Sequence, residues 1–335
     1  MPCSQTGHWS GTPFHRESWM TLLDRVAEAY RSHAGIAQKS PIGLATEIFG
    51  ATDWLTGPGD DGALVPTQGG HVVVGGEAMF PPFVDADPRA TGFAAVLANV
   101  NDLAAMGATP LGILNTVVGP APIAELVLEG MRDASVMYDV PIIGGHLTVR
   151  DGPASVAAFG IGEATSVLSV RNVRPGQALL LACALDGTMR DDFPFFASFD
   201  ERRDQMAGDI RTLADVADFS GVVAAKDVSM AGLLGSLAML LEARQAGAVI
   251  DLDSMPVPEG IAMERWLIAF PAFAFLLCTD IAGIEKCRAP FVDRGLTCEQ
   301  IGVVTDTGLL EVVSKGASEV IVRFPDDRLT GIAPL

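Results

Sequence analysis

The chain has 335 residues, 49% of them hydrophobic, and a formal net charge of -19. A surface this acidic repels nucleic-acid phosphates and anionic lipids, so we expect no nucleic-acid partner and no membrane partner. The longest apolar stretches, such as residues 268–278, are too short to span a bilayer, and the N-terminus does not read as a signal peptide. Five cysteines without CxxC spacing indicate reduced packing thiols and a cytoplasmic protein.

The first half of the chain is predicted to alternate strands and helices. A polar tail over residues 1–16 precedes an amphipathic helix over 18–33, for which Ser18 is the expected cap. Apolar and β-branched runs then predict strands over residues 62–65, 71–78, 111–118, 141–143 and 154–161. Helical periodicity predicts helices over residues 88–107 and 122–138.

A turn at residues 173–177, which contains Arg-Pro-Gly-Gln, indicates the start of a second alternating unit. Strands are predicted over residues 178–183, 248–252, 273–278 and 297–304, with helices over 229–245 and 281–294. The charged segment 187–220 is either a helical insertion or a mobile segment. The predicted fold class is therefore α/β (α+β).

Two stretches of the first half place carboxylates where a cation could bind. Asp60 and Asp61 follow a glycine-rich turn before a predicted strand. Two carboxylates that turn inward together need a cation such as Mg²⁺, whereas a solvated turn needs none. Asn99 and Asp102 share one face of a helix that is otherwise small and apolar, where a carboxylate must be paired, bound to metal or bonded to the backbone. Metal binding and a structural role both stay open.

Two further stretches combine small residues with groups that could contact a ligand. Gly144 and Gly145 follow a predicted strand and allow close approach of the backbone, and His146 beside them is a ligand, a phosphate contact or a core residue. Asp227 ends a strand before a helix whose small first residues, from Ser229 on, would leave an open N-terminus for phosphate. Neither a Walker A nor a Rossmann glycine pattern occurs.

Together these stretches resemble the AIR synthetase (PurM-like) superfamily, which includes thiamine-monophosphate kinase, selenophosphate synthetase and formylglycinamidine ribonucleotide synthetase. The matching pieces, in chain order, are GPGDDGALV, NVNDLAAMGATP, IIGGHLT and KDVSMAGLLGSLAMLLEARQAGAVIDLDSMPVP. The match spans residues 55–305. The chain is most similar to the AIR synthase-related proteins of nitrilase-associated gene clusters.

The resemblance implies a PurM-like two-domain fold with ATP and Mg²⁺ as cofactors. Its parts would be an N-terminal tail and helix over residues 1–45, an ATP-binding domain over 46–168 and a C-terminal α/β domain over 169–335. It implies a homodimer whose N-terminal halves build a shared β-barrel, with other enzymes of the same pathway as further candidate partners. The implied metal ligands are Asp60, Asp61, Glu77, Asp102 and Asp227. The implied nucleotide contacts are Asp60, Asp61, Asn99, Asp102, Gly144, Gly145 and Asp227, and the implied catalytic residues are Asp102 and His146.

Three positions depart from the kinase-like members of the superfamily. A Thr-Asp pair is replaced by Gly76-Glu77, an Asp-Thr pair by His146-Leu147, and an Asp-Gly pair by Met230-Ala231. We expect an enzyme in which ATP phosphorylates an amide, formyl or acid oxygen of a small molecule, followed by ring closure, amination or dehydration. The alternatives are a small-metabolite kinase, similar to thiamine-monophosphate kinase, and a non-catalytic ATP-binding partner protein.

Overall fold

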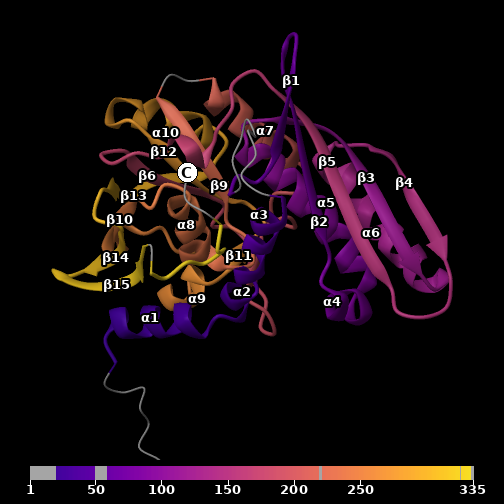
Figure 1. Ribbon diagram of the computed structural model, residues 1–335, viewed down its shortest axis with the longest axis horizontal. Helices are drawn as coiled ribbons and strands as arrows, with labels where there is room; N and C mark the ends of the chain where they lie inside the picture. Colours follow the sequence, from indigo (N-terminus) through magenta and orange to yellow (C-terminus); the bar gives the residue numbers. More distant parts are fainter. Residues whose placement is uncertain (1–19, 50–58, 219–220, 325, 333–335) are drawn as a thin grey trace, which may run out of the picture.

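The computed structural model describes residues 20–49, 59–218, 221–324 and 326–332. Two lobes lie side by side, each built around its own β-sheet (Figure 1). This mixed arrangement of sheets and helices confirms the predicted α/β (α+β) class. The polar tail predicted over residues 1–16 and the expected cap Ser18 lie outside the described residues.

The first lobe is a five-stranded sheet covered on one face by two long helices. Its elements are β1 (Ala63–Thr67), β2 (Gly70–Ala78), α4 (Pro81–Ala86), α5 (Pro88–Ala105), β3 (Thr109–Gly119), α6 (Ala121–Tyr138), β4 (Ile142–Val149) and β5 (Ser155–Ala164). The strand order is β1-β2-β5-β3-β4, and only β3 and β4 run parallel. These elements agree with the predicted ones with two exceptions. The short helix α4 was not predicted, and the strand expected over residues 141–143 continues to Val149.

Glycines set the spacing between α5 and α6. A Cβ on Gly92 would overlap the carbonyl oxygen of Val127, and a Cβ on Gly130 would overlap that of Arg89. The two helices therefore pack backbone to backbone, which no larger residue permits at these positions.

We expect Gly92→Ala to lower the free energy of unfolding by about 1–3 kcal/mol, because the overlap forces the helices apart and outweighs the better helix propensity of alanine. Urea unfolding followed by circular dichroism measures the change. Gly69→Ala, at a turn position where a Cβ meets nothing within 4 Å, is the matched control and should unfold like the wild type. Equal stability of both variants would contradict the close contact.

The second lobe is a seven-stranded sheet in the order β15-β14-β10-β13-β6-β12-β9. Its strands are β6 (Ala178–Cys183), β9 (Val222–Asp227), β10 (Gly247–Asp251), β12 (Ala274–Thr279), β13 (Thr297–Thr305), β14 (Leu309–Ser314) and β15 (Ala317–Arg323). Its longer helices are α7 (Met206–Ala217), α8 (Gly232–Glu242) and α10 (Ile284–Val292), with shorter turns at η3 (Val170–Asn172), η4 (Leu252–Ser254), α9 (Met263–Leu267) and η5 (Ile281–Gly283). Only β10 and β14 pair in parallel.

Helices cover both faces of this second sheet, so its central strands are buried along their whole length. In β6, Leu179 and Leu181 pack into the core layer that contains α8, whereas Leu180 and Ala182 pack into the layer that contains α7 and α10. This burial explains the uninterrupted apolar runs in the sequence. The cysteines Cys183, Cys278, Cys287 and Cys298 are free and buried in these layers, as predicted for packing thiols. Within the described ranges, no helix has the length and apolarity that a bilayer crossing requires.

The N-terminal segment packs against the second lobe rather than the first. Helix α1 (Leu22–Ser32) contacts α9, β14 and β15, and its cap is Thr21, whose backbone N–H donates to Asp24 Oδ2 at 2.8 Å. It is followed by α2 (Ala34–Ala37), η2 (Ser40–Ile42) and α3 (Gly43–Phe49). The N–H of Gly43 donates to the carbonyl oxygen of Thr330 at 2.7 Å. The two terminal segments thus meet beside the groove between the lobes.

The segment 187–220, which the sequence left open, is ordered wherever the structure describes it. Strands β7 (Thr188–Met189) and β8 (Phe195–Ala197) form a small sheet with β11 (Phe270–Pro271), and α7 follows. Helix α7 contacts α5 and α6 of the first lobe and α10 of the second. It therefore joins the two lobes into one continuous core.

Candidate functional site

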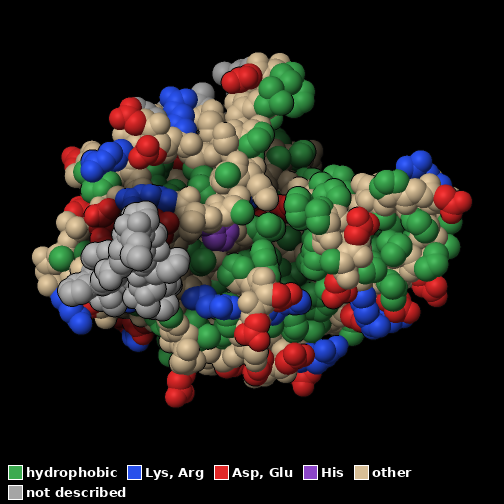
Figure 2. Space-filling model, turned by 90° about the horizontal axis from the view of Figure 1, so that it is seen from below, with side chains coloured by type: hydrophobic (Ala, Val, Ile, Leu, Met, Phe, Trp, Pro, Cys, Tyr) green, Lys and Arg blue, Asp and Glu red, His purple; other side chains and the backbone are tan. Residues whose placement is uncertain are grey.

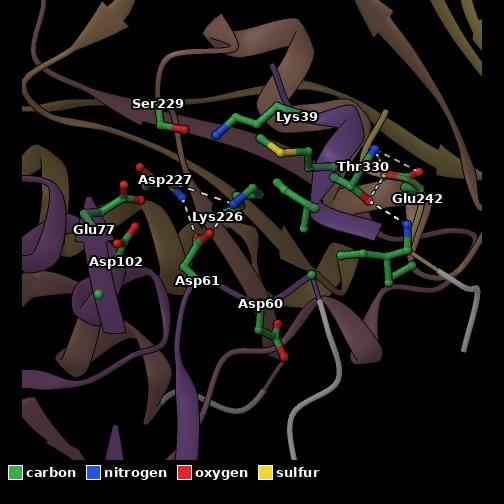
Figure 3. Close-up of a pocket in the computed structure, with 16 residues that line it drawn as sticks. Lys39, Asp60, Asp61, Glu77, Asp102, Lys226, Asp227, Ser229, Glu242 and Thr330 are labelled. Carbon is green, nitrogen blue, oxygen red and sulfur yellow. Dashed lines mark hydrogen bonds and ion pairs between the residues drawn. The ribbon is translucent and has the colours of Figure 1, made fainter. Parts of the chain in front are cut away.

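A pocket lies where the two lobes and the terminal segments meet. The surface is hollowed between the lobes in Figure 2, and Figure 3 shows the side chains that line the pocket. The first lobe contributes an acidic wall, and the second lobe contributes β9 and one face of α8. The charged or polar lining residues are Lys39, Asp60, Asp61, Glu77, Asp102, Lys226, Asp227, Ser229, Glu242 and Thr330.

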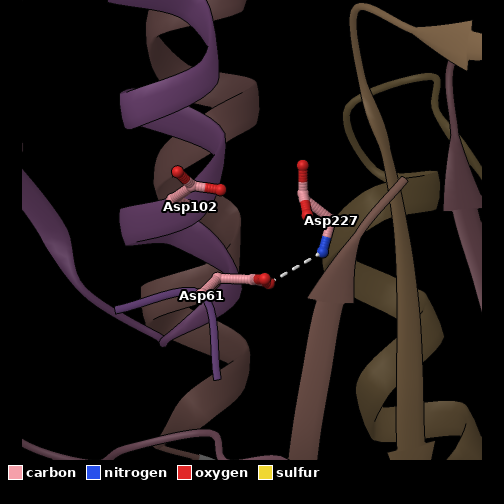
Figure 4. Close-up of side chains that lie close together, drawn as sticks. All are labelled: Asp61, Asp102 and Asp227. Carbon is pink, nitrogen blue, oxygen red and sulfur yellow. Dashed lines mark hydrogen bonds between the residues drawn. The ribbon is translucent and has the colours of Figure 1, made fainter. Parts of the chain in front are cut away.

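Three aspartates come together at the inner end of the pocket. Asp61 precedes β1, Asp102 lies on α5, and Asp227 ends β9 (Figure 4). One carboxylate oxygen of each lies within 4.8 Å of the others. The backbone N–H of Asp227 also donates to Asp61 Oδ2 at 3.2 Å. The structure therefore brings together three of the five predicted metal ligands; we call these three the aspartate cluster.

One lysine faces the aspartate cluster from inside the protein. Lys226 Nζ forms an ion pair with Asp61 and lies 3.6 Å from Asp227 Oδ1, and its side chain is only 6% exposed. Burial by itself lowers the pKa of Lys226, but the negative charges of Asp61 and Asp227 outweigh it, so the pKa is raised. The ammonium group is therefore charged at every physiological pH.

Burial and repulsion by neighbouring carboxylates raise the pKa of several carboxyls in the pocket, among them those of Asp227, Asp102 and Glu77. Burial is the main cause at Asp227, with a further contribution from the charge of Asp61, and the resulting pKa is about 7. The pKa of Asp102 is raised by burial and by the charges of its carboxylate neighbours, Asp227 first. Burial also raises the pKa of Glu77. The protein alone therefore supplies too little positive charge around these carboxyls to keep their pKa at its usual value.

Asp60 and Glu77 line the pocket but lie outside the aspartate cluster. The carboxylate of Asp60 accepts hydrogen bonds from Ser169 Oγ and from the backbone N–H of Val170, both at 2.7 Å. Burial raises the pKa of Asp60 to about 6, against the lowering effect of these two donors. Asp60 therefore ties the loop before β1 to η3. Glu77 stands beside Asp102 at the edge of the pocket (Figure 3).

The glycine-histidine stretch, residues 144–146, is not among the residues that line the pocket. Gly144, Gly145 and His146 lie within β4, at the edge of the first sheet, and the His146 ring contacts Thr148 Oγ1 at 3.0 Å. His146 pairs in register with Thr116 of β3 and is exposed. The strand predicted over residues 141–143 continues through these residues, so the two glycines lie within the strand and do not follow it. The catalytic role of His146 and the nucleotide contacts of the two glycines stay predictions.

Two other predicted features differ from expectation. Asn99 is fully buried under the first sheet, where its Nδ2 donates to the carbonyl oxygen of Ala95 and its Oδ1 has no partner among the described residues. It does not line the pocket, so its nucleotide contact stays a prediction. The helix expected to open at Ser229 begins at Gly232 with its first turn buried, so the prediction of an open helix N-terminus at Ser229 is wrong. Ser229 itself still lines the pocket.

Sequence reasoning did not single out several residues of the pocket. Lys226 had one signal, a lysine at the end of an otherwise apolar strand directly before Asp227. No sequence signal pointed to Lys39 or Thr330, because these two residues come from opposite ends of the chain and meet only in the folded protein. Glu242, buried on α8, accepts from the N–H and Oγ1 of Thr330 at 3.0 and 2.8 Å and so holds the C-terminal segment against the pocket.

The residues of the aspartate cluster fit a hard divalent cation. Three carboxylates from separate parts of the chain come together, and one ammonium group pairs with only two of them, which leaves excess negative charge. Carboxylate oxygens are the ligands that Mg²⁺ prefers, and a bound cation removes the cost of burying them together. Asp61, Asp102 and Asp227 would hold such an ion.

Two family models match the chain. The model described as AIR synthase related protein, N-terminal domain, matches residues 59–164, and the corresponding C-terminal domain matches residues 199–315. A Synechocystis sp. protein of uncharacterised activity is 30% identical over 92% of this chain and 98% of its own length. A thiamine-monophosphate kinase from Rhodopirellula baltica is 34% identical over 72% of this chain and 76% of its own length. The chain spans less than half of a Methanopyrus kandleri phosphoribosylformylglycinamidine synthase subunit PurL, to which it is 29% identical over 84% of this chain and 42% of that protein.

Solved structures share the fold at low sequence identity. The structure of a HypE-HypF complex matches with a TM-score of 0.64 and 20% identity, covering 84% of this chain and 99% of that one. T. maritima PurL complexed with ADP matches with a TM-score of 0.69 and 18% identity, covering 82% of this chain and 47% of that one. These matches agree with the two-lobed architecture described above. The chain belongs to the AIR synthase-related family of the PurM-like superfamily.

Proposed function

We propose that the chain binds ATP with Mg²⁺ in this pocket and phosphorylates an amide, formyl or acid oxygen of a small molecule, with ring closure, amination or dehydration to follow. The observation that carries the proposal is the aspartate cluster at the junction of the lobes. The names of related proteins support it, since T. maritima PurL is seen in complex with ATP and a thiamine-monophosphate kinase is 34% identical.

The side chains of the pocket suit phosphoryl transfer, which needs positioning and charge neutralisation more than covalent chemistry. Mg²⁺ bound here would neutralise phosphate charge. Asp61, Asp102 and Asp227 hold the cation in the proposal, while Lys39 and Lys226 add positive charge to the pocket wall. Glu242 and Thr330 also line the pocket, and the hydrogen bonds between them hold the C-terminal segment beside it.

Release of ADP in the presence of Mg²⁺ and a panel of small amides, formamides and carboxylic acids tests the proposal, with products identified by mass spectrometry. A dehydrated, aminated or cyclised product is expected together with ADP. Tight ATP binding without turnover on any acceptor would instead favour a non-catalytic binding protein. Absence of ATP binding would contradict the proposal.

A small-metabolite kinase is the second candidate, favoured by the 34% identity to a thiamine-monophosphate kinase. The departures at Glu77, His146 and Met230 count against it. The two candidates differ in the product of the same assay. A phosphorylated product that persists would support the kinase, whereas a product that has lost the phosphate would exclude it.

Binding of Mg²⁺ in the presence of ATP is expected to strengthen as pH rises from about 6 to 8. The pKa of Asp227 is about 7, so below that pH a proton competes with the cation for this carboxylate. Isothermal titration of Mg²⁺ at both pH values measures the change. An Asp227→Asn variant should show a weaker pH dependence, since only carboxyls such as Asp102, whose pKa is also raised, still titrate. Unchanged pH dependence in the variant would mean that Asp227 does not cause it.

We propose a homodimer that uses the face of the first sheet turned away from α5 and α6. Val65 and Phe159 are exposed there, at 51% and 42%, and His146 lies on the same face of β4. Burial of this apolar face would stabilise a dimer. We expect Phe159→Asp to convert a dimer into a monomer in size-exclusion chromatography with light scattering. A wild-type monomer, or a dimer that is unaffected by the change, would contradict this interface. The cytoplasmic location and contacts with other enzymes of a pathway stay predictions.

A further inference from the structure

The aspartate cluster already contains a cation that belongs to the protein. Lys226 is the second-last residue of β9 (Val222–Asp227), and all six residues of this strand except Val223 are buried. Its ammonium group contacts Asp61 and stands 3.6 Å from Asp227 Oδ1. It therefore lies between two of the three residues proposed to hold Mg²⁺.

The side chain of Lys226 is held in this position because it is buried. It is 6% exposed, so the ammonium group has left bulk water and depends on carboxylates for its interactions. Lys39, the other lysine of the pocket, differs from it, because no ion pair joins Lys39 to a carboxylate among the described residues, and its side chain is only half-buried. Positive charge in direct contact with the cluster thus comes from Lys226.

Three carboxylates this close repel one another strongly in a partly desolvated site. One ammonium group that contacts two of them offsets much of that repulsion without a metal ion. It also fills the space between Asp61 and Asp227 and supplies positive charge there. The third carboxylate, Asp102, has no ion pair with a lysine or arginine in the described residues and remains open to a cation.

We propose that the ammonium group of Lys226 occupies one cation position of the aspartate cluster. The wild-type protein therefore keeps the three aspartates together without metal. It also binds one divalent cation fewer than the same cluster would bind if Lys226 were removed. The proposal rests on the proposed function in that the remaining cation is the one that accompanies ATP. Lys226 is a positioning residue in this view, since it acts through the aspartates.

Mn²⁺ binding to the full-length protein without nucleotide tests the proposal, with free Mn²⁺ followed by electron paramagnetic resonance. Lys226→Ala should bind one additional Mn²⁺ per chain, or bind Mn²⁺ at least about tenfold more tightly than the wild type, because a positive charge next to the ion has gone. Its thermal midpoint should fall in EDTA and recover in Mg²⁺ or Mn²⁺, whereas the wild-type midpoint should change little.

Lys226→Gln, which keeps a hydrogen-bond donor for Asp61, serves as the second variant if the alanine protein does not fold, and it should show the same gain. Lys39→Gln is the matched control, because it removes a positive charge from the same pocket without touching the cluster, and it should gain no Mn²⁺. Equal Mn²⁺ binding by the wild type and both Lys226 variants would overturn the proposal. Since no nucleotide is present, this result does not depend on whether the protein binds ATP.

Discussion

Asp102→Asn is expected to weaken Mg²⁺-dependent ATP binding by at least about 100-fold, which corresponds to about 2.7 kcal/mol, while leaving the metal-free protein folded. Asp102 is 9% exposed, and its carboxylate lies within 4.8 Å of oxygens of Asp61 and Asp227. Asparagine keeps the shape of the side chain but removes the charge that attracts the cation. Since that charge is repelled by its neighbours when no metal is bound, its loss should not destabilise the fold.

Equilibrium titration of ATP with and without Mg²⁺ measures the effect, and urea unfolding in EDTA checks the stability. Asp133→Asn is the matched control, because Asp133 lies on α6 at the surface and pairs with the exposed Arg89. The control should bind ATP as the wild type does. Unchanged Mg²⁺-dependent binding in Asp102→Asn would show that the aspartate cluster is not the metal site.

The sequence was sufficient to find the aspartates of the pocket but not their surroundings. Asp61, Asp102 and Asp227 each stand in a local pattern that needs an explanation: a glycine turn, a buried helix and the end of a buried strand. Lys226 stands in such a pattern too, but a single lysine beside an aspartate does not reveal that both point into the same space. That fact depends on how β9 crosses α5, which is a property of the tertiary packing.

The glycine-histidine stretch illustrates the opposite case. The sequence places the two glycines in IIGGHLT after a short strand over residues 141–143, where they would let the backbone approach a ligand. In the structure they lie in the edge strand β4, and Gly145 has φ +155, a backbone conformation that side chains rarely adopt. Pairing with β3 along the whole stretch outweighs the weak strand propensity of glycine. Local propensity could not predict this, because the partner strand lies thirty residues earlier.

The charged segment 187–220 was the least predictable part of the fold. Its charges indicated either a helical insertion or a mobile segment, but Arg202 and Asp209 are both buried in the core. The carboxylate of Asp209 accepts from Arg202 Nε at 2.9 Å and from Arg294 Nε at 2.7 Å. Arg294 follows α10, more than eighty residues along the chain. A prediction from the neighbouring sequence therefore does not include Arg294, whose positive charge helps Asp209 to occupy a core position.

Asp209→Asn is expected to lower the free energy of unfolding by about 3 kcal/mol, because it leaves the buried guanidinium of Arg202 without its main carboxylate. The exposed fraction is 0% for the Asp209 side chain and 4% for that of Arg202, so water cannot replace the lost partner. Helix α7 carries Asp209 and contacts both lobes, which means that its displacement would uncover the shared core. Urea unfolding measures the loss.

Asp186→Asn is the matched control for this prediction. Asp186 pairs with the same arginine, at 3.3 Å from Arg202 Nη1, but its side chain is 49% exposed. Water can replace its carboxylate, so the control should unfold close to the wild-type midpoint. Similar losses in the two variants would mean that burial of Asp209 does not decide the strength of the interaction. A large loss in Asp209→Asn alone would establish that the buried carboxylate stabilises the fold at α7, the helix that contacts both lobes and therefore both walls of the pocket.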